Sequence, residues 1–191
     1  MNNREIKEPL KRIPVYMNTI GDYQLKGYNY VIDNIKNMST VKNKDDNDSV
    51  QQIPTFENME SFGYTYLERP LQSLDIVYPN KEFDKIINGE ASTMNQEDIV
   101  KRIVGKNGLM NIMTYKTTEQ IRYNFQCIAE TLDKYGRIFS PNVITNYSGK
   151  ISSICNTILK SKGIIIVYSQ YIDGGVVPIA LALEELGFTR Y

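Results

Sequence analysis

Apolar and polar side chains alternate at three places along this chain, and alternation with a period of two is typical of β-strands. The first place is residues 12–18, where a proline suits an edge strand. The third ends at a proline, which predicts the end of the strand. The alternating sets are Ile13, Val15 and Met17; Phe62, Tyr64 and Tyr66; and Leu74, Ile76 and Tyr78.

Other stretches have the spacing of an amphipathic helix. Leu25, Tyr28 and Ile32 predict a helix that begins near Asn18 or Thr19, both of which are residues that cap helices. A second helix is predicted over residues 95–104. Residues 117–135 fit both periods, because Ile121, Tyr123, Phe125 and Cys127 alternate whereas Ile121, Phe125, Ile128 and Leu132 have helical spacing.

The C-terminal stretch predicts a helix, a strand and a second helix. Ser148 caps the first helix and Gly163 ends it, and residues 164–168 (IIIVY) form a continuous apolar strand. Residues 173–175 (DGG) turn the chain into the second helix, which Gly187 ends. The residues expected to face the core are Ile151, Ile154, Cys155, Ile158 and Leu159 in the first helix and Val176, Ile179, Ala180, Leu183 and Leu186 in the second.

An apolar strand without polar alternation normally lies inside a parallel sheet, covered on both faces. Residues 164–168 therefore need neighbouring strands. Either the weaker candidate strands upstream supply them, or they lie beyond Tyr191. We favour the second alternative and expect the chain to be a piece of a larger protein.

Composition excludes several classes of chemistry. The 22 basic residues balance the 22 acidic residues, so no net charge attracts nucleic acid or a membrane. Histidine is absent, which removes the usual general base and the commonest metal ligand. Cys127 and Cys155 lie far apart in the sequence, so we expect no metal site and two core thiols of a reducing compartment. No apolar run reaches the length that spans a bilayer, and the expected partners therefore include no membrane.

Two Gly-Lys pairs, in residues 104–108 (VGKNG) and 148–150 (SGK), raise the possibility of an ATP phosphate loop. That loop requires a glycine five residues before the glycine of the pair, and Ser or Thr after the lysine. The first positions hold Val100 and Ile144, and the second positions hold Asn107 and Ile151. The sequence therefore predicts no phosphate loop.

Residues 147–191, with the sequence YSGKISSICNTILKSKGIIIVYSQYIDGGVVPIALALEELGFTRY, resemble the start of the second RecA-like domain of superfamily 2 helicases. Swi/Snf-type ATPases have a similar SGK helix and a Phe-Ser-Gln strand, named motif IV. Residues 15–35 resemble the end of the first RecA-like domain, with Gln24 and Tyr28 at the matching positions. Residues 56–79 and 135–141 extend the likeness to helicases of large nucleocytoplasmic DNA viruses, which are mimivirus-like and related to the poxvirus early transcription factor helicase subunit.

The resemblance implies an α/β protein with a partial RecA-like fold of the P-loop NTPase type. Its expected parts are the end of domain one, a flexible linker, an inserted irregular α+β region, and the truncated start of domain two. These parts are residues 1–37, 38–55, 56–145 and 146–191.

The implied function is that of an ATP-dependent DNA or RNA helicase or translocase in viral transcription or genome processing. ATP and Mg²⁺ belong to the full-length parent, whose hydrolysis motifs this chain lacks, so we expect no catalytic residue here. Lys150, Ser169 and Gln170 are the expected nucleic-acid contacts. The implied partners are DNA or RNA, the remaining helicase domains and the viral transcription machinery, in the host-cell cytoplasm or the virion. The alternatives are a complete, non-catalytic small α/β binding protein and an accessory protein from a decayed helicase gene.

Overall fold

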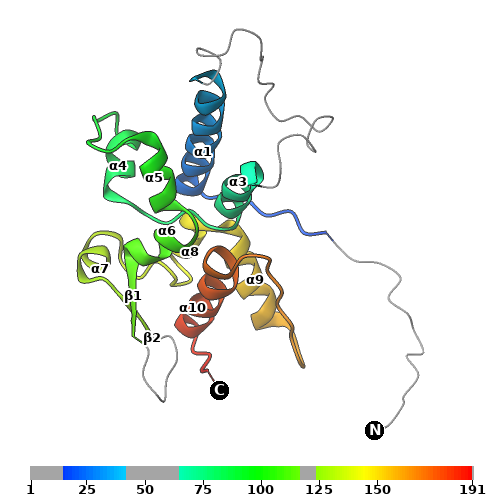
Figure 1. Ribbon diagram of the computed structural model, residues 1–191. Coiled ribbons are helices and arrows are strands. Elements are labelled where there is room, and N and C mark those ends of the chain that lie inside the picture. Colours follow the sequence, from blue (N-terminus) through cyan, green and yellow to red (C-terminus); the bar gives the residue numbers. More distant parts are fainter. Residues whose placement is uncertain (1–14, 42–64, 117–123, 191) are drawn as a thin grey trace.

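The computed structural model describes residues 15–41, 65–116 and 124–190, and within them the fold is mixed α/β and mostly helical (Figure 1). The α/β class expected from the sequence is confirmed at this coarse level. The α-helices are α1 (Asp22–Val41), α3 (Thr65–Asp75), α4 (Lys81–Ile87), α5 (Gln96–Ile103), α6 (Gly105–Ile112), α7 (Ala129–Tyr135), α8 (Ile144–Tyr147), α9 (Gly149–Lys160) and α10 (Val177–Glu185).

The long first helix predicted by the sequence is present, but its buried face differs from the expected one. Leu25 is 45% exposed, whereas Gln24 and Gly27 are buried. Gly27 lies so close to Val77 that an added Cβ would come within 2.5 Å of a Val77 methyl carbon, so the glycine lets the helix approach the core. The buried face of α1 thus combines a polar residue, Gln24, with the apolar Val31, and differs from the face that the spacing predicted.

The strand and helix predicted from residue 12 onward differ from expectation at both ends. Residues 15–18 are exposed and form no strand, and residues 12–14 lie outside the described residues. Helix α1 continues to Val41, so its last residues enter the segment predicted to be a linker. The remainder of that segment, residues 42–55, lies outside the described part of the chain.

Asparagine side chains explain where two short helices begin. Oδ1 of Asn80 accepts hydrogen bonds from the backbone N–H groups of Glu82, at 2.9 Å, and Phe83, at 3.2 Å, and so caps α4. Oδ1 of Asn95 accepts from Asp98 N–H at 2.8 Å and caps α5, which confirms the helix predicted over residues 95–104. Helices α4 and α6 were not predicted.

The described sheet has two antiparallel strands, β1 (Met113–Lys116) and β2 (Asn124–Cys127). Their register pairs Met113 with Cys127 and Lys116 with Asn124. Residues 117–135, whose spacing fitted both a strand and a helix, contain strand β2 first and helix α7 after it. Within residues 15–41, 65–116 and 124–190 the expected parallel sheet is not found.

The predicted strand at Leu74–Tyr78 is wrong, because Leu74 and Asp75 lie in α3 and residues 76–78 belong to no sheet among the described residues. The rest is extended and separates two hydrophobic cores. Ile76 and Tyr78 lie in one core and Val77 in the other, so the alternation is correct although no ladder forms. Instead, Val77 N–H donates to the carbonyl of Tyr147 at 3.0 Å, and Tyr78 N–H donates to that of Ile103 at 2.7 Å. The second alternating set, Phe62, Tyr64 and Tyr66, is not a strand where it is described, because Tyr66 belongs to α3; Phe62 and Tyr64 lie outside the described residues.

The C-terminal unit begins as predicted. Ser148 caps α9, with its Oγ accepting from Ile151 N–H at 3.0 Å. The helix ends at Lys160, ahead of Gly163, whose φ of +92° suits glycine. Leu159, expected in the core, is 54% exposed.

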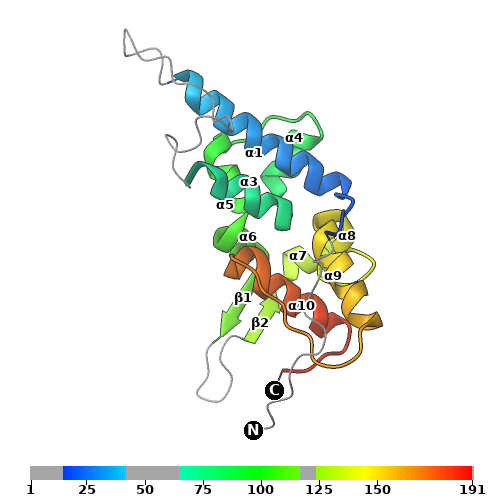
Figure 2. The same ribbon diagram turned by 90° about the vertical axis from the view of Figure 1, so that its right-hand side faces the viewer.

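Residues 164–168 run extended from the end of α9 back past α10 (Figure 2) and belong to no sheet within the described chain, so the predicted strand is wrong in its pairing. The chain then forms a π-helical segment, Ile172–Val176, that continues into α10. Pro178 lies in the first turn of α10, as predicted. Ile179 is buried as expected, but Leu181 and Ala182 are buried in place of Val176 and Ala180.

Candidate functional site at the start of helix α9

The three predicted nucleic-acid contacts lie together in the structure. Lys150, Ser169 and Gln170 line one cavity of about 310 Å³, although nearly twenty residues separate the lysine from the other two. The end of α3, the start of α9, the turn after residues 164–168 and the π-helical segment form its walls. The other lining residues are Leu71, Leu74, Asp75, Ile151, Ile154, Tyr168, Tyr171, Gly174, Gly175 and Ile179.

Protein acceptors already occupy the backbone amides at the start of α9. Gly149 N–H donates to Oε1 of Gln24 at 3.0 Å, and Ile151 N–H donates to the Ser148 side chain. Ser148 in turn donates its hydroxyl to the carbonyl of Asp75 at 2.5 Å. A phosphate loop needs such amides to be free for the phosphate. The SGK stretch therefore builds a helix cap and not a phosphate loop.

Gln24 connects three elements at this place. Its Nε2 donates to the carbonyls of Ser73, at 3.0 Å, and Leu74, at 3.1 Å, while its Oε1 accepts from Gly149. Gln24 is only 1% exposed, so these bonds satisfy a fully buried amide. The side chain thus fixes the start of α1 against the end of α3 and the start of α9.

The backbone of Thr19 occupies the space that a side chain at residue 149 would need. A Cβ at Gly149 would lie 1.8 Å from the carbonyl oxygen of Thr19. A Cβ at Gly21 would lie 2.2 Å from the carbonyl oxygen of Thr145. These two glycines allow the residues before α1 and the α8–α9 corner to be in direct backbone contact.

The charge of Lys150 is compensated inside the site. Its Nζ forms an ion pair with Oδ1 of Asp75. The lysine side chain is 45% exposed but the aspartate side chain is only 15% exposed, so the carboxylate is the less accessible partner. A nucleic-acid phosphate at Lys150 would therefore compete with Asp75, which lowers the favourable charge that the lysine offers.

Local contacts hold Ser169 and the turn that follows. Ser169 Oγ accepts from Tyr171 N–H at 3.2 Å. A Cβ at Gly175 would lie 2.0 Å from that hydroxyl oxygen, so a glycine is needed there. The buried phenol of Tyr78 donates to the carbonyl of Asp173 and ties the π-helical segment to the core. Burial beside the carboxylates of Asp173 and Asp75 raises the pKa of Tyr78, so the phenol stays protonated.

Gln170 also reaches a larger and more polar cavity of about 810 Å³ between α3, α5, α6 and the π-helical segment. Residues 105–107 of the VGKNG stretch lie at its edge. Gly105 has a φ of +60°, and a Cβ there would lie 2.4 Å from Oε1 of Gln72. Opposite charges pair on this edge, since Glu97 lies 3.8 Å from Arg69 and 2.9 Å from Lys101. The cavity therefore offers no excess of either charge for an ionic ligand.

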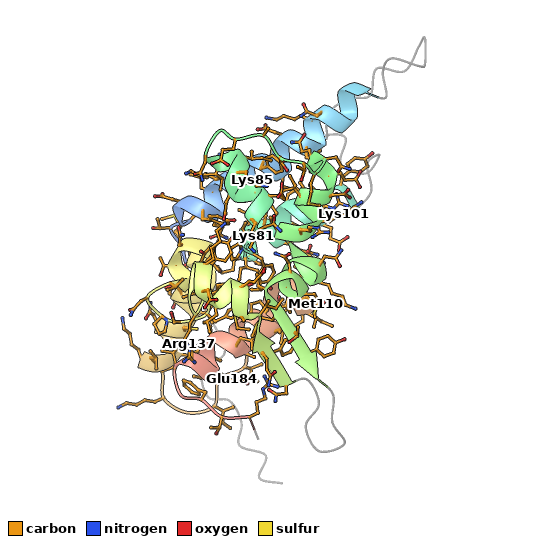
Figure 3. The ribbon with its side chains drawn as sticks, turned by 90° about the vertical axis from the view of Figure 1, so that its left-hand side faces the viewer. Lys81, Lys85, Lys101, Met110, Arg137 and Glu184 are labelled. Atoms are coloured by element: carbon orange, nitrogen blue, oxygen red, sulfur yellow. The ribbon has the colours of Figure 1, made fainter. Side chains whose placement is uncertain are left out.

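Three lysines on α4 and α5 also have acidic partners. Figure 3 shows Lys81, Lys85 and Lys101 spread over two helices, not gathered into one patch. Such a distribution is not that of a nucleic-acid-binding surface. The nitrogen–oxygen distances are 2.7 Å for Lys81 and Glu130, 2.6 Å for Lys85 and Glu82, and 2.9 Å for Lys101 and Glu97.

Asp84 forms a second polar cluster, away from the site. It accepts from the hydroxyls of Tyr23, at 3.0 Å, and Tyr135, at 2.6 Å, and its carboxylate lies 2.6 Å from Nζ of Lys134. Burial and the nearby carboxylate raise the pKa values of both tyrosines. The cluster joins α1, α4 and α7, and its groups all have partners, so we assign it a structural role.

Sequence reasoning placed Tyr78 in an alternating set but missed Asp75 and Gln72 as residues that shape the site. Each is a single residue without a repeated spacing, so no sequence pattern could have identified it. Among the described residues no three His, Cys, Asp or Glu side chains are grouped to hold a metal ion. Burial raises the pKa of both free thiols, Cys127 and Cys155.

Within the described ranges, no helix has the length and apolar character needed to cross a bilayer. Comparison with known proteins provides no further assignment: no protein-family model, no curated protein and no solved structure matches this chain.

Proposed function

We propose that this chain is the joint between the two RecA-like domains of an ATP-dependent superfamily 2 helicase or translocase of the large nucleocytoplasmic DNA virus type. One observation supports this proposal above others. Gln24 and Gly149 belong to the two separate stretches that carry the resemblance, and they are hydrogen-bonded across 125 residues. Stretches that function together are expected to meet in space, and these two meet beside the cavity lined by Lys150, Ser169 and Gln170.

In this proposal Ser169 and Gln170 donate hydrogen bonds to the phosphates or sugars of DNA or RNA. Lys150 adds a positive charge that Asp75 partly compensates. Contacts of this kind fix the position of the backbone and carry no base preference. The expected affinity of this chain alone is low, with a shallow dependence on salt concentration.

ATP and Mg²⁺ bind to the parent in this proposal, between motifs that this chain does not carry. Phosphoryl transfer requires a phosphate-binding lysine, metal ligands and an arginine around one nucleotide. The expected partners are the remaining helicase domains and viral transcription proteins, in the host-cell cytoplasm or the virion. The chain by itself is expected to hydrolyse no ATP.

The test measures binding to fluorescent single-stranded DNA, single-stranded RNA and duplex oligonucleotides by anisotropy at several salt concentrations. Lys150→Gln is expected to weaken binding about fivefold and to reduce the salt slope by about one. Asp75→Asn removes the competing carboxylate and is expected to strengthen binding. Lys160→Gln, at the exposed end of the same helix, is the matched control and should change little. Equal binding by all four proteins would refute the nucleic-acid role.

Sequencing the gene on both sides of this reading frame tests the parent assignment separately. A GxxxxGK[ST] loop and a DExx pair upstream, with an arginine-bearing motif downstream, would support it. Flanks without these motifs would contradict it.

A second candidate function is that of a non-catalytic binding protein. The observation that favours it is the exposure of large apolar side chains at residues 164–168. Large contiguous apolar patches are rare on the surface of a monomer and often mark a site of interaction with another molecule.

A further inference from the structure

Residues 164–168 have an extended backbone whose hydrogen-bonding groups have no backbone partner among the described residues. The chain leaves α9 at Lys160 and enters the π-helical segment at Ile172. Between these points no backbone–backbone hydrogen bond joins residues 163–168 to any described residue. Toward the described residues, both long edges of the segment therefore present N–H and C=O groups without a backbone partner, which is the condition of an unpaired β-strand.

The side chains of this segment alternate between a covered face and an open face. Ile164, Ile166 and Tyr168 are 96%, 89% and 87% exposed, whereas Ile165 and Val167 are 42% and 39% exposed. A period of two is the geometry of a strand. One face is thus half-covered by the body of the protein, and the other is almost entirely open.

Three large apolar side chains on the open face form a patch of several hundred Å², on the order of the largest patch on a typical monomer. Natural edge strands are usually protected by charges, prolines or bulges. Residues 163–172 contain no charged residue and no proline. The segment thus has the composition of an interior strand, although it lies in an exposed position.

The chemistry of the segment excludes several occupants. Lipid would cover the open face but would leave the backbone groups of both edges unsatisfied. Nucleic acid would bring phosphates to a segment without a cation between Lys162 and Asp173. A second copy, paired antiparallel across a two-fold axis, would place both open faces on the same side of the ribbon. That pairing would double the exposed apolar area and would not cover it.

We propose that residues 164–168 bind a β-strand from polypeptide outside this chain, other than a second copy, by adding it to the free edge. The partner strand donates and accepts backbone hydrogen bonds along the segment, as in other recognition by strand addition. It presents apolar, β-branched side chains at alternate positions beside Ile164, Ile166 and Tyr168. This inference rests on exposure and hydrogen bonding, and it does not depend on the nucleic-acid role proposed above.

The test selects random short peptides displayed on phage against the full chain, with counter-selection against Ile166→Lys. Enriched peptides are then synthesised, and their affinities are measured by fluorescence anisotropy. We expect enrichment of alternating β-branched sequences whose affinity falls at least about tenfold for Ile166→Lys, which places a charge on the open face. Leu159→Lys is the matched control, because Leu159 is also an exposed apolar residue but lies in α9.

Two further measurements separate strand pairing from simple apolar contact. A selected peptide with N-methyl groups on the amides of one edge should lose its binding, because it can no longer donate those hydrogen bonds. Hydrogen exchange of the amides of residues 164–168 should slow at least about tenfold when the unmodified peptide is bound.

Several results would overturn the proposal. These are the absence of enriched peptides, peptides without alternation, or equal binding by Ile166→Lys. Slow exchange of these amides in the protein alone, at a concentration where it is monomeric, would show that another segment of the same chain already pairs with them. Concentration-dependent protection would show that a second copy does.

Discussion

The side-chain carbonyl of Gln24 accepts a hydrogen bond of 3.0 Å from the backbone N–H of Gly149, and this bond joins helices α1 and α9 across 125 residues. Removing the amide leaves three backbone groups without their partner in a place that water does not reach. We expect Gln24→Ala to lower the free energy of unfolding by about 3 kcal/mol, measured by urea denaturation. Gln126→Ala, at an exposed position, is the control and should change stability little. A loss at Gln24 no larger than that at Gln126 would contradict the role assigned to this amide.

Gly149→Ala tests the backbone contact beside the same bond. Since an added Cβ would lie 1.8 Å from the Thr19 carbonyl oxygen, the residues before α1 must move away. We expect a loss of about 3 kcal/mol or more, and a fall in the melting temperature. Gly89→Ala is the comparison, because Gly89 has a φ of +79° but open space around it, so only the backbone strain of about 1 kcal/mol applies. Similar losses at the two positions would show that the close contact is not important.

Alkaline pH should destabilise the protein through its buried tyrosines. Tyr23, Tyr78 and Tyr135 have pKa values raised above 10.0, mainly by burial. A raised pKa means that their contribution to stability is complete below pH 10 and is lost as the pH rises further. We expect the tyrosinate absorption of these three groups to appear together with loss of helical circular dichroism, after the exposed tyrosines have titrated. Titration of all tyrosines at a constant helical signal would refute this prediction.

Acid pH should destabilise the region around α4. Lys85 and Ser92 contact the carboxylate of Glu82 and lower its pKa from 4.5 to about 2. A lowered pKa means that the stabilisation is present above the unfolded value and is lost as the pH falls from 4.5 toward 2. The melting temperature of Glu82→Gln should therefore depend less on pH in this window than that of the unmodified protein. Parallel pH profiles for the two proteins would show that the carboxylate contributes nothing there.

Local signals in the sequence predicted helix positions better than strand pairing. The cap residue Ser148 and the spacing of residues 95–104 are signals contained within one or two helical turns, and the helices that they predicted, α9 and α5, are both present. Pairing depends on segments far apart in the sequence, which periodicity does not identify. Ile76 and Tyr78 alternate as predicted, yet their segment is bonded to the carbonyls of two helices and not to a neighbouring strand.

At the candidate site, too, the sequence predicted some residues and missed a feature that depends on tertiary structure. The sequence identified Lys150, Ser169 and Gln170 by resemblance, and the structure places them around one cavity. It did not indicate Asp75, whose carboxylate compensates Lys150, because a single acidic residue at the end of a helix has no distinctive pattern. Charge compensation of this kind is a tertiary property and changes what the lysine can bind.

The contact between Gln24 and Gly149 also affects how the chain folds during synthesis. Gly149, at the start of α9, is synthesised 125 residues after Gln24. At typical elongation rates that interval is about 6 to 25 s, far longer than the formation of a helix. Throughout that time Oε1 of Gln24 can accept a hydrogen bond only from water at this corner, whereas its Nε2 can donate to Ser73 and Leu74 as soon as α3 is made. The order of translation thus delays closure of the corner between α1 and α9, although α1 can already dock on α3.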